Sequence, residues 1–280
     1  MIFAVLGGDA RQQSLARLLE ADGHAVHCFA LGAETDCASA AEAADGADCV
    51  LLPTPVCARP GLLNVPLCEN ACSLDEVLSG LSPAQLLIGG RVDADTARTA
   101  ARYGLSVTDC MLREELAVGN AAATAEGAVE LLLRESPRTL WRSRVLVLGF
   151  GRIGRLLCSR LVPFGARVSA AARRKSERVW IEAMGCEALD VRAPEGLERF
   201  ELLVNTVPSC VLPEEQLRRV RKDALLLELA SAPGGIDRAA AERLGLRVLC
   251  APGLPGKTAP LTAAELLRSC IYNVVEEHHG

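Results

Sequence analysis

One stretch near the middle of the chain constrains the fold more than any other. It reads RVLVLGFGRIGRLLCSRL, residues 144–161, and three glycines separate an apolar run from a helical pattern. Glycines at this spacing permit a tight turn, close approach of a pyrophosphate, and close packing of a helix on a strand. We expect a dinucleotide-binding site here, although an ordinary glycine-rich turn between a strand and a helix would have a similar sequence. The expected cofactor contacts are Gly149, Gly151, Arg152, Ile153 and Gly154.

The end of the next expected strand indicates which dinucleotide binds. An NAD site usually has an acidic residue about 20 residues after the glycines, where it bonds the ribose hydroxyls. Here the corresponding run is Arg173, Arg174, Lys175 and Ser176. Guanidinium groups and a hydroxyl suit a 2′-phosphate, so we predict NADP(H). The alternative is a solvated basic turn.

Apolar runs alternate with helical patterns along the whole chain, which predicts parallel sheets covered by helices. We expect an α/β protein with two doubly wound parallel-sheet domains, the second a Rossmann domain. The proposed boundaries are 1–118, 119–256 and 257–280, with a crossing helix at 121–135 and a C-terminal helix that returns to the first domain. The expected strands are Ile2–Leu6, Ala25–Phe29, Cys49–Leu52, Leu86–Ile88, Leu105–Val107, Val145–Leu148, Arg167–Ala170, Leu202–Asn205, Leu225–Leu229 and Arg247–Leu249.

Composition excludes several classes of protein. The net charge of −5 gives no basic face for nucleic acid. No apolar run is long enough to span a bilayer, and the N-terminus lacks the features of a signal peptide. The 12 cysteines are scattered through apolar segments without zinc-type spacing. We therefore expect a cytoplasmic protein with no metal site and no membrane or nucleic-acid partner.

Loops after the later strands complete the expected cofactor site, because the carboxyl ends of parallel strands face the ligand crevice. Each loop could instead be a turn in which Pro and Gly supply only backbone geometry. The expected contacts are Asn205, Thr206, Val207, Pro208, Ala230, Ser231, Pro252 and Gly253.

The first domain should hold the substrate. The turn GGDAR offers backbone N–H groups at a helix start, from Gly8 onward, and the guanidinium of Arg11. Alternatively, Asp9 caps the helix and Arg11 lies in solvent. The run NAAATAEG adds Asn120 and Thr124, where Thr124 could equally be a helix cap. Lys257 either faces an anionic substrate or belongs to a rigid connector.

The chain resembles the A subunits of dipicolinate synthase, a family of sporulation enzymes. The resemblance rests on LGGDARQ, N-x3-T-x-EG, VLGFGRIG, VNTVPS, ELASAPGGID and APGLPGKTAP. It implies NADP-dependent oxidation of a dihydrodipicolinate-type species to pyridine-2,6-dicarboxylate in the mother cell. It also implies a partner, the flavoprotein-like B subunit, and we expect a homo-oligomer. Should a 4-hydroxy precursor be dehydrated first, Glu126 and Asp9 are the candidate acid–base groups.

A wider resemblance is to D-2-hydroxyacid dehydrogenases, which share the two-domain layout. Those enzymes use an arginine and a histidine in the loops that correspond to ASAPGG and APGLPG here, and both residue types are missing. Oxidation of an alcohol needs a base, whereas oxidation of a dihydropyridine is driven by aromatisation. Two alternatives stay open: a nucleotide-binding regulatory protein without chemistry of its own, and a hydroxyacid-dehydrogenase-like enzyme.

Overall fold

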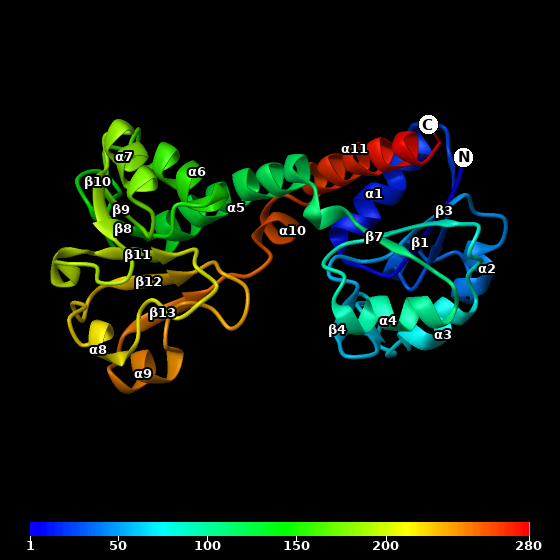
Figure 1. Cartoon of the computed structure of the whole chain (residues 1–280), viewed down its shortest axis with the longest axis horizontal. Coiled ribbons are helices and arrows are strands. Elements are labelled where there is room, and N and C mark those ends of the chain that lie inside the picture. Colours follow the sequence, from blue (N-terminus) through cyan, green and yellow to red (C-terminus); the bar gives the residue numbers. More distant parts are fainter. Residues whose placement is uncertain (280) are drawn as a thin grey trace. The chain divides into compact units, whose positions relative to one another are not determined.

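The computed structural model describes residues 1–279, which form two compact units (Figure 1). The first unit comprises Met1–Asn120 together with the C-terminal segment from Ala259. The second unit is the continuous segment Ala121–Thr258. The chain therefore passes from one unit to the other twice.

The first unit contains a five-stranded sheet in the order β2-β1-β3-β6-β7, and every neighbouring pair is parallel. A separate antiparallel pair, β4 with β5, lies outside this sheet. The strands are β1 (Ile2–Leu6), β2 (Ala25–Phe29), β3 (Cys49–Leu51), β4 (Cys57–Arg59), β5 (Leu62–Leu63), β6 (Leu86–Gly89) and β7 (Val107–Asp109).

Helices cover both faces of this sheet (Figure 1). One core contains apolar residues of α1 and α11, and the opposite core contains those of α2, α3 and α4. Burial on both faces explains why the strands are almost continuously apolar. The helices are α1 (Ala10–Ala21), α2 (Ala40–Ala44), α3 (Leu74–Ser79), α4 (Ala94–Arg102) and α11 (Pro260–His279), with 3₁₀ turns η1 (Gly32–Glu34) and η2 (Cys110–Leu112).

Helix α11 is an integral part of the first unit. Ile271 is 2% exposed in the core that α11 shares with α1. At the edge of that contact, Tyr272 Oη donates a hydrogen bond to Asp22 Oδ2 at 2.6 Å. Burial, together with this carboxylate, raises the pKa of Tyr272 to about 12. A helix late in the sequence thus covers one face of the sheet that contains β1.

The second unit contains a six-stranded parallel sheet in the order β10-β9-β8-β11-β12-β13. The strands are β8 (Arg144–Leu148), β9 (Arg167–Ala172), β10 (Glu187–Asp190), β11 (Leu202–Asn205), β12 (Leu225–Glu228) and β13 (Arg247–Cys250). One face packs on α5, α6 and α7, and the other on α8 and α9. The helices are α5 (Glu114–Glu135), α6 (Arg152–Leu161), α7 (Lys175–Ala183), α8 (Glu214–Leu217), α9 (Arg238–Arg243) and α10 (Leu254–Thr258), with the 3₁₀ turn η3 (Leu197–Arg199).

The crossing helix begins earlier than its expected start at residue 121. Helix α5 starts at Glu114 and runs through Gly119 and Asn120, both weak helix formers. A Cβ at Gly119 would lie 2.6 Å from Leu266 Cδ2, so the glycine allows α5 to approach α11 closely. Thr124 consequently lies within the helix, and the interpretation of Thr124 as a helix cap is wrong.

Helix α5 also qualifies the expectation that no segment could span a bilayer. It is long and apolar enough to do so by length and composition, but 56% of its apolar window is buried inside the protein. Ala125, Ala128 and Leu132 are fully buried in the core of the second unit. The apolar composition of α5 is explained by this packing.

Other differences from the sequence expectation concern short elements. Strands β4, β5 and β10 have only two to four residues each and carry no long apolar pattern. The run APGLPGKTAP, expected to be a loop, contains the short helix α10. Pro255 is the second residue of α10, where a missing N–H costs no intrahelical hydrogen bond.

We predict that Ile271→Ala lowers the free energy of unfolding by about 2–5 kcal/mol, because it leaves a cavity between α11 and α1. Urea denaturation followed by circular dichroism measures the change. Leu261→Ala, on the same helix at a position 55% exposed, is the matched control and should change stability by less than about 0.5 kcal/mol. Equal losses in the two variants would contradict the packing described.

Candidate functional site

The glycine turn after β8 has the geometry that a dinucleotide site requires. Gly149 has φ of +97°, and a Cβ there would lie 2.4 Å from Thr206 Oγ1. A Cβ at Gly154 would lie 2.1 Å from the carbonyl oxygen of Gly149, so α6 packs directly on the turn. A Cβ at Gly151 would meet nothing within 4 Å. The turn is therefore closed toward the protein and open where a pyrophosphate would lie, which fits a dinucleotide.

The turn lies at the point where strand order reverses. The chain passes from β8 to β9 on one side of the sheet and later returns to β11 on the other side of β8. The crevice outside the carboxyl ends of two such strands is where open α/β sheets bind ligands. Thr206 ties these ends together, because its Oγ1 donates to the Leu148 carbonyl at 2.9 Å. Arg152 and Ile153 begin α6 beside this crevice.

The basic run follows β9 beside the glycine turn. Arg173, Arg174, Lys175 and Ser176 are all exposed, and the N–H of Gly149 donates to the Ala171 carbonyl at 2.9 Å. The nearest acidic residue in sequence, Glu177, pairs with Arg174 at 2.5 Å. That hydrogen bond lowers the pKa of Glu177. An NAD site has a ribose-binding carboxylate at the end of this strand. This chain instead has three cationic side chains there, followed by the first turn of α7.

Asn205 is not a contact residue, contrary to expectation. It is 0% exposed, and its Nδ2 donates to Glu228 Oε1 at 2.7 Å and to the Val207 carbonyl at 2.9 Å. Its Oδ1 accepts the Val207 N–H. Asn205 therefore shapes the loop that presents Val207, which is partly buried, and Pro208, which is exposed.

Glu228 is the residue that sequence reasoning missed. This carboxylate at the end of β12 is 5% exposed and accepts hydrogen bonds from Asn205 and from the N–H groups of Ala230, Gly235 and Ile236. A buried charge is tolerated when several donors surround it. Glu228 thus fixes the loop that holds Ala230 and the exposed Ser231. The only sequence signal is an acidic residue inside an apolar strand.

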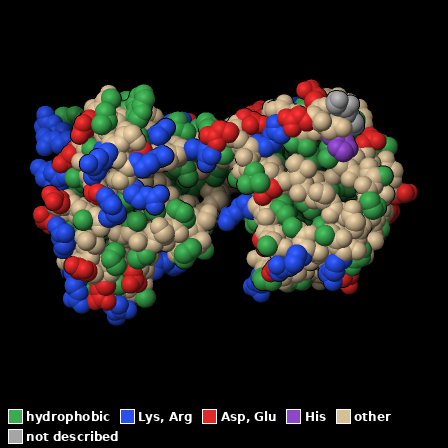
Figure 2. All heavy atoms as spheres, viewed as in Figure 1, with side chains coloured by type: hydrophobic (Ala, Val, Ile, Leu, Met, Phe, Trp, Pro, Cys, Tyr) green, Lys and Arg blue, Asp and Glu red, His purple; other side chains and the backbone are tan. Residues whose placement is uncertain are grey.

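The two units differ strongly in charge. Of the 30 Lys and Arg residues, 22 lie in residues 121–258, along with 16 of the 35 acidic residues. The second unit thus carries a formal charge of +6, and the rest of the chain carries −11. Figure 2 shows Lys and Arg side chains spread over the second unit, at the left of the view. A positive unit attracts the phosphates of a nucleotide.

The first unit has its own reversal of strand order, between β1 and β3. The turn GGDAR follows β1 there, but its N–H groups are not available to an anion as expected. Gly7 donates to Phe29 O, Gly8 to Asn64 O, and Asp9 to Gln12 Oε1. The last of these hydrogen bonds belongs to a capping box between Asp9 and Gln12.

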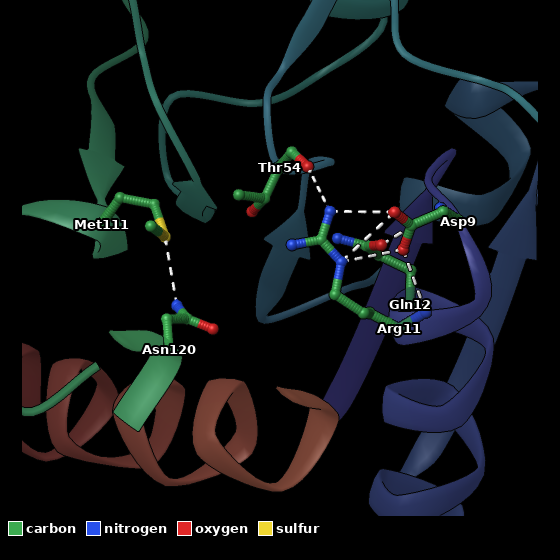
Figure 3. A network of polar contacts seen from close by, with 6 residues as sticks. All are labelled: Asp9, Arg11, Gln12, Thr54, Met111 and Asn120. Atoms are coloured by element: carbon green, nitrogen blue, oxygen red, sulfur yellow. Dashed lines mark hydrogen bonds and ion pairs between the residues drawn. The ribbon is translucent and has the colours of Figure 1, made fainter. Parts of the chain in front are cut away.

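Arg11 is the cationic side chain that the turn presents. Its side chain is 14% exposed, so the alternative interpretation, in which it lies in solvent, is wrong. Nε and Nη2 donate to the carboxylate of Asp9, and Nη2 also donates to the Thr54 carbonyl at 2.6 Å. In Figure 3, Nη1 points toward the side of the unit where Met111 and Asn120 lie. Asp9 therefore acts as a helix cap and a positioning residue for Arg11.

The remaining expected residues lie on α5 and α10. Asn120 Nδ2 contacts Met111 Sδ at 3.7 Å (Figure 3). Thr124 is 8% exposed. Glu126, a candidate acid–base group, lies in the middle of α5, has a side chain that is 69% exposed and pairs with Arg160 at 3.0 Å. Lys257 is exposed in the last turn of α10.

Comparison with known proteins places this geometry in a family. Residues 2–111 match the N-terminal domain of the dipicolinate synthase A subunit. The A subunit of dipicolinate synthase from Bacillus subtilis (strain 168) is 30% identical over 98% of this chain and 95% of its own length. The chain belongs to the family of dipicolinate synthase A subunits. The name of that relative implies a partner subunit.

Solved structures of dipicolinate synthase A subunits share the whole fold. The protein from Bacillus subtilis matches with a TM-score of 0.85 and 27% identity, covering 99% of this chain and 96% of its own. The protein from Bacillus halodurans matches with a TM-score of 0.86 and 24% identity, covering 98% of this chain and 97% of its own.

The second unit has a wider likeness. Residues 120–240 match the NAD binding domain of D-isomer specific 2-hydroxyacid dehydrogenases, which implies a nicotinamide cofactor. The apo-structure of D-lactate dehydrogenase from Escherichia coli has a TM-score of 0.63 at 15% identity, covering 100% of this chain and 98% of its own. At that identity the likeness shows the fold: two parallel α/β sheets, the second in a dehydrogenase-like domain.

We predict that Gly151→Val abolishes nucleotide binding while the protein still folds, because the side chain enters the open space beside the turn. Thermal melts with and without NADP(H) check this: the nucleotide-dependent rise in Tm should disappear. Gly154→Ala is the contrasting variant and should destabilise the protein itself, since its Cβ meets the Gly149 carbonyl. A nucleotide-dependent shift retained in Gly151→Val would count against the site.

Proposed function

We propose that this protein oxidises a dihydrodipicolinate-type compound to pyridine-2,6-dicarboxylate with NADP, together with a partner subunit, in the cytoplasm of a sporulating mother cell. Membership of the family of dipicolinate synthase A subunits supports the substrate class. The nicotinamide-binding domain supports the type of reaction. The resemblance to the family suggests that the partner is the flavoprotein-like B subunit.

The observation that carries the choice of NADP is the exposed run at the end of β9. Arg173, Arg174 and Lys175 offer cationic donors, and Ser176 offers a hydroxyl in the first turn of α7. A 2′-phosphate would gain charge-assisted hydrogen bonds there. An NAD-type site would need a carboxylate at the same place, and the one close by, on Glu177, is paired with Arg174.

The proposed reaction removes one hydride and one proton from a dihydropyridine ring. NADP would supply the hydride acceptor. The aromatic product provides the driving force, so the chain chiefly binds and orients the ring. Such a reaction needs little acid–base catalysis, which is consistent with the lack of histidine between Arg144 and Pro260. Arg11, held by Asp9 and Thr54, offers Nη1 to one substrate carboxylate. Lys257, in the second unit, stays a predicted contact for an anionic substrate.

The test of the function is turnover by the purified chain, alone and with its partner subunit. Reduced nicotinamide should appear only when NADP and the dihydropyridine dicarboxylate are both present. Nucleotide binding without turnover in either mixture would instead assign a regulatory role. Turnover of simple 2-hydroxy acids would assign a hydroxyacid dehydrogenase with a displaced site.

We predict that replacing Arg173 and Arg174 with alanine weakens binding of NADP(H) far more than binding of NAD(H), which lacks the 2′-phosphate. Each charge-assisted hydrogen bond contributes roughly 1.5–3 kcal/mol. Fluorescence titration of both reduced cofactors measures the difference. Replacing Arg218 and Arg219, which are exposed on the same unit, removes the same charge and should affect both cofactors slightly and equally. Equal losses of affinity for NADP(H) and NAD(H) in the Arg173/Arg174 variant would contradict the assignment of NADP(H) as the cofactor.

We predict that Arg11→Ala raises KM for the dicarboxylate at least tenfold, about 1.4 kcal/mol, with little change in NADP(H) affinity. Steady-state kinetics and nucleotide titration measure the two effects. Arg11→Lys should recover only part of the loss, because an ammonium cannot pair with Asp9 through two nitrogens and still bind substrate. An unaltered KM in Arg11→Ala would place the anion site elsewhere, with Lys257 the next candidate.

A further inference from the structure

Three side chains of different chemistry converge on the outer edge of the first sheet. They are His27 on β2 and the adjacent pair Asp36 and Cys37, which follows the turn η1. One ligand atom from each residue lies within 4.8 Å of the others. A ring nitrogen, a carboxylate oxygen and a thiol thus lie close together.

Backbone hydrogen bonds build this cluster. Strand β2 is the edge of its sheet, and the returning chain bonds to its open side. The N–H groups of Asp36 and Cys37 both donate to the Cys28 carbonyl at 3.1 Å. In return, the Cys28 N–H donates to Asp36 Oδ1 at 2.6 Å. The carboxylate is therefore fixed through one oxygen, and its other oxygen faces the imidazole.

The spacing suits a tetrahedral cation. His27 Nδ1 and Asp36 Oδ2 are 3.8 Å apart. Zinc ligands at bond lengths of about 2.0–2.3 Å are about 3.3–3.6 Å apart in a tetrahedral site. A movement of about half an ångström would bring these two atoms onto one ion, and Cys37 Sγ, which lies within 4.8 Å of both, would have to approach by up to about an ångström. Because Asp36 Oδ1 already accepts a backbone N–H, the carboxylate has the outer support that metal ligands usually have.

We propose that His27, Asp36 and Cys37 form a binding site for Zn²⁺ or a similar divalent transition cation. Imidazole, carboxylate and thiolate are the three ligand types that zinc accepts, whereas Mg²⁺ and Ca²⁺ require oxygen ligands. Three protein ligands leave the fourth position to water. The side chains of His27 and Asp36 are 44% and 51% exposed, so solvent and cation can reach them.

The Asp36 carboxylate gives the cluster a negative charge that favours a cation. No zinc-type spacing marks the cluster in the sequence, since pairing at the β2 edge, and not a short motif, brings residue 27 beside residues 36 and 37.

The first experiment measures metal binding on the purified full chain with the metal ion alone. Equilibrium dialysis should show that the wild type binds one more Zn²⁺ per chain than Cys37→Ser does. In His27→Ala the Kd of this additional ion should rise at least about tenfold. Cys210→Ser, which removes an exposed thiol of the second unit, is the matched control and should bind as the wild type does. Mg²⁺ and Ca²⁺ should not compete.

Co²⁺ tests the ligand set directly. The wild type and Cys210→Ser should show a thiolate-to-cobalt charge-transfer absorption that Cys37→Ser lacks. Hydrogen exchange on the wild type needs no variant: Zn²⁺ should slow exchange of the amides of Cys28, Asp36 and Cys37. Unchanged exchange, or a charge-transfer band that survives in Cys37→Ser, would overturn the proposal. None of these measurements depends on the proposed oxidation or on NADP.

Discussion

In both units every strand of the main sheet runs parallel to its neighbours, and this pairing decides where chemistry can occur. Parallel strands end at one edge of a sheet, so the loops that follow them gather there. The turn after β1 and Thr54 after β3 meet at one such edge. The glycine turn and Thr206 meet at another. The side chains that we assign to the substrate and to the nucleotide follow from these two reversals of strand order.

Within that framework, buried polar groups set the shape of the loops. Glu228 gathers three loop N–H groups and the amide of Asn205, and the cost of burying its charge is offset by these donors. In the first unit Asp9 has a similar role, because it caps α1 and holds Arg11 against the Thr54 carbonyl. Both carboxylates orient other groups. This arrangement is consistent with a chain that positions a ring and leaves the driving force to its aromatisation.

The features that can be predicted from the sequence are those that repeat or that depend on local geometry. The glycine spacing, the basic run after β9 and most strands of both sheets are of this kind. The role of Glu228 could not be predicted, because its donors come from residues that are up to 23 positions away. The expected start of α5 is wrong because Gly119 and Asn120 are weak helix formers, and the contact with Leu266 that requires the glycine is distant in sequence. The grouping of His27 with Asp36 and Cys37 depends on how the returning chain pairs with β2.

The two crossings of the chain impose an order on folding during synthesis. The second unit is a continuous segment, so all of its strands are available once Thr258 has left the ribosome. The first unit lacks the apolar face of α11 until that helix has been translated, and the α1 side of its sheet stays uncovered in the nascent chain until then. Domains usually fold in the order in which they are synthesised. Here the unit that starts first finishes last, so the apolar α1 side of its sheet is the surface that stays exposed longest during synthesis.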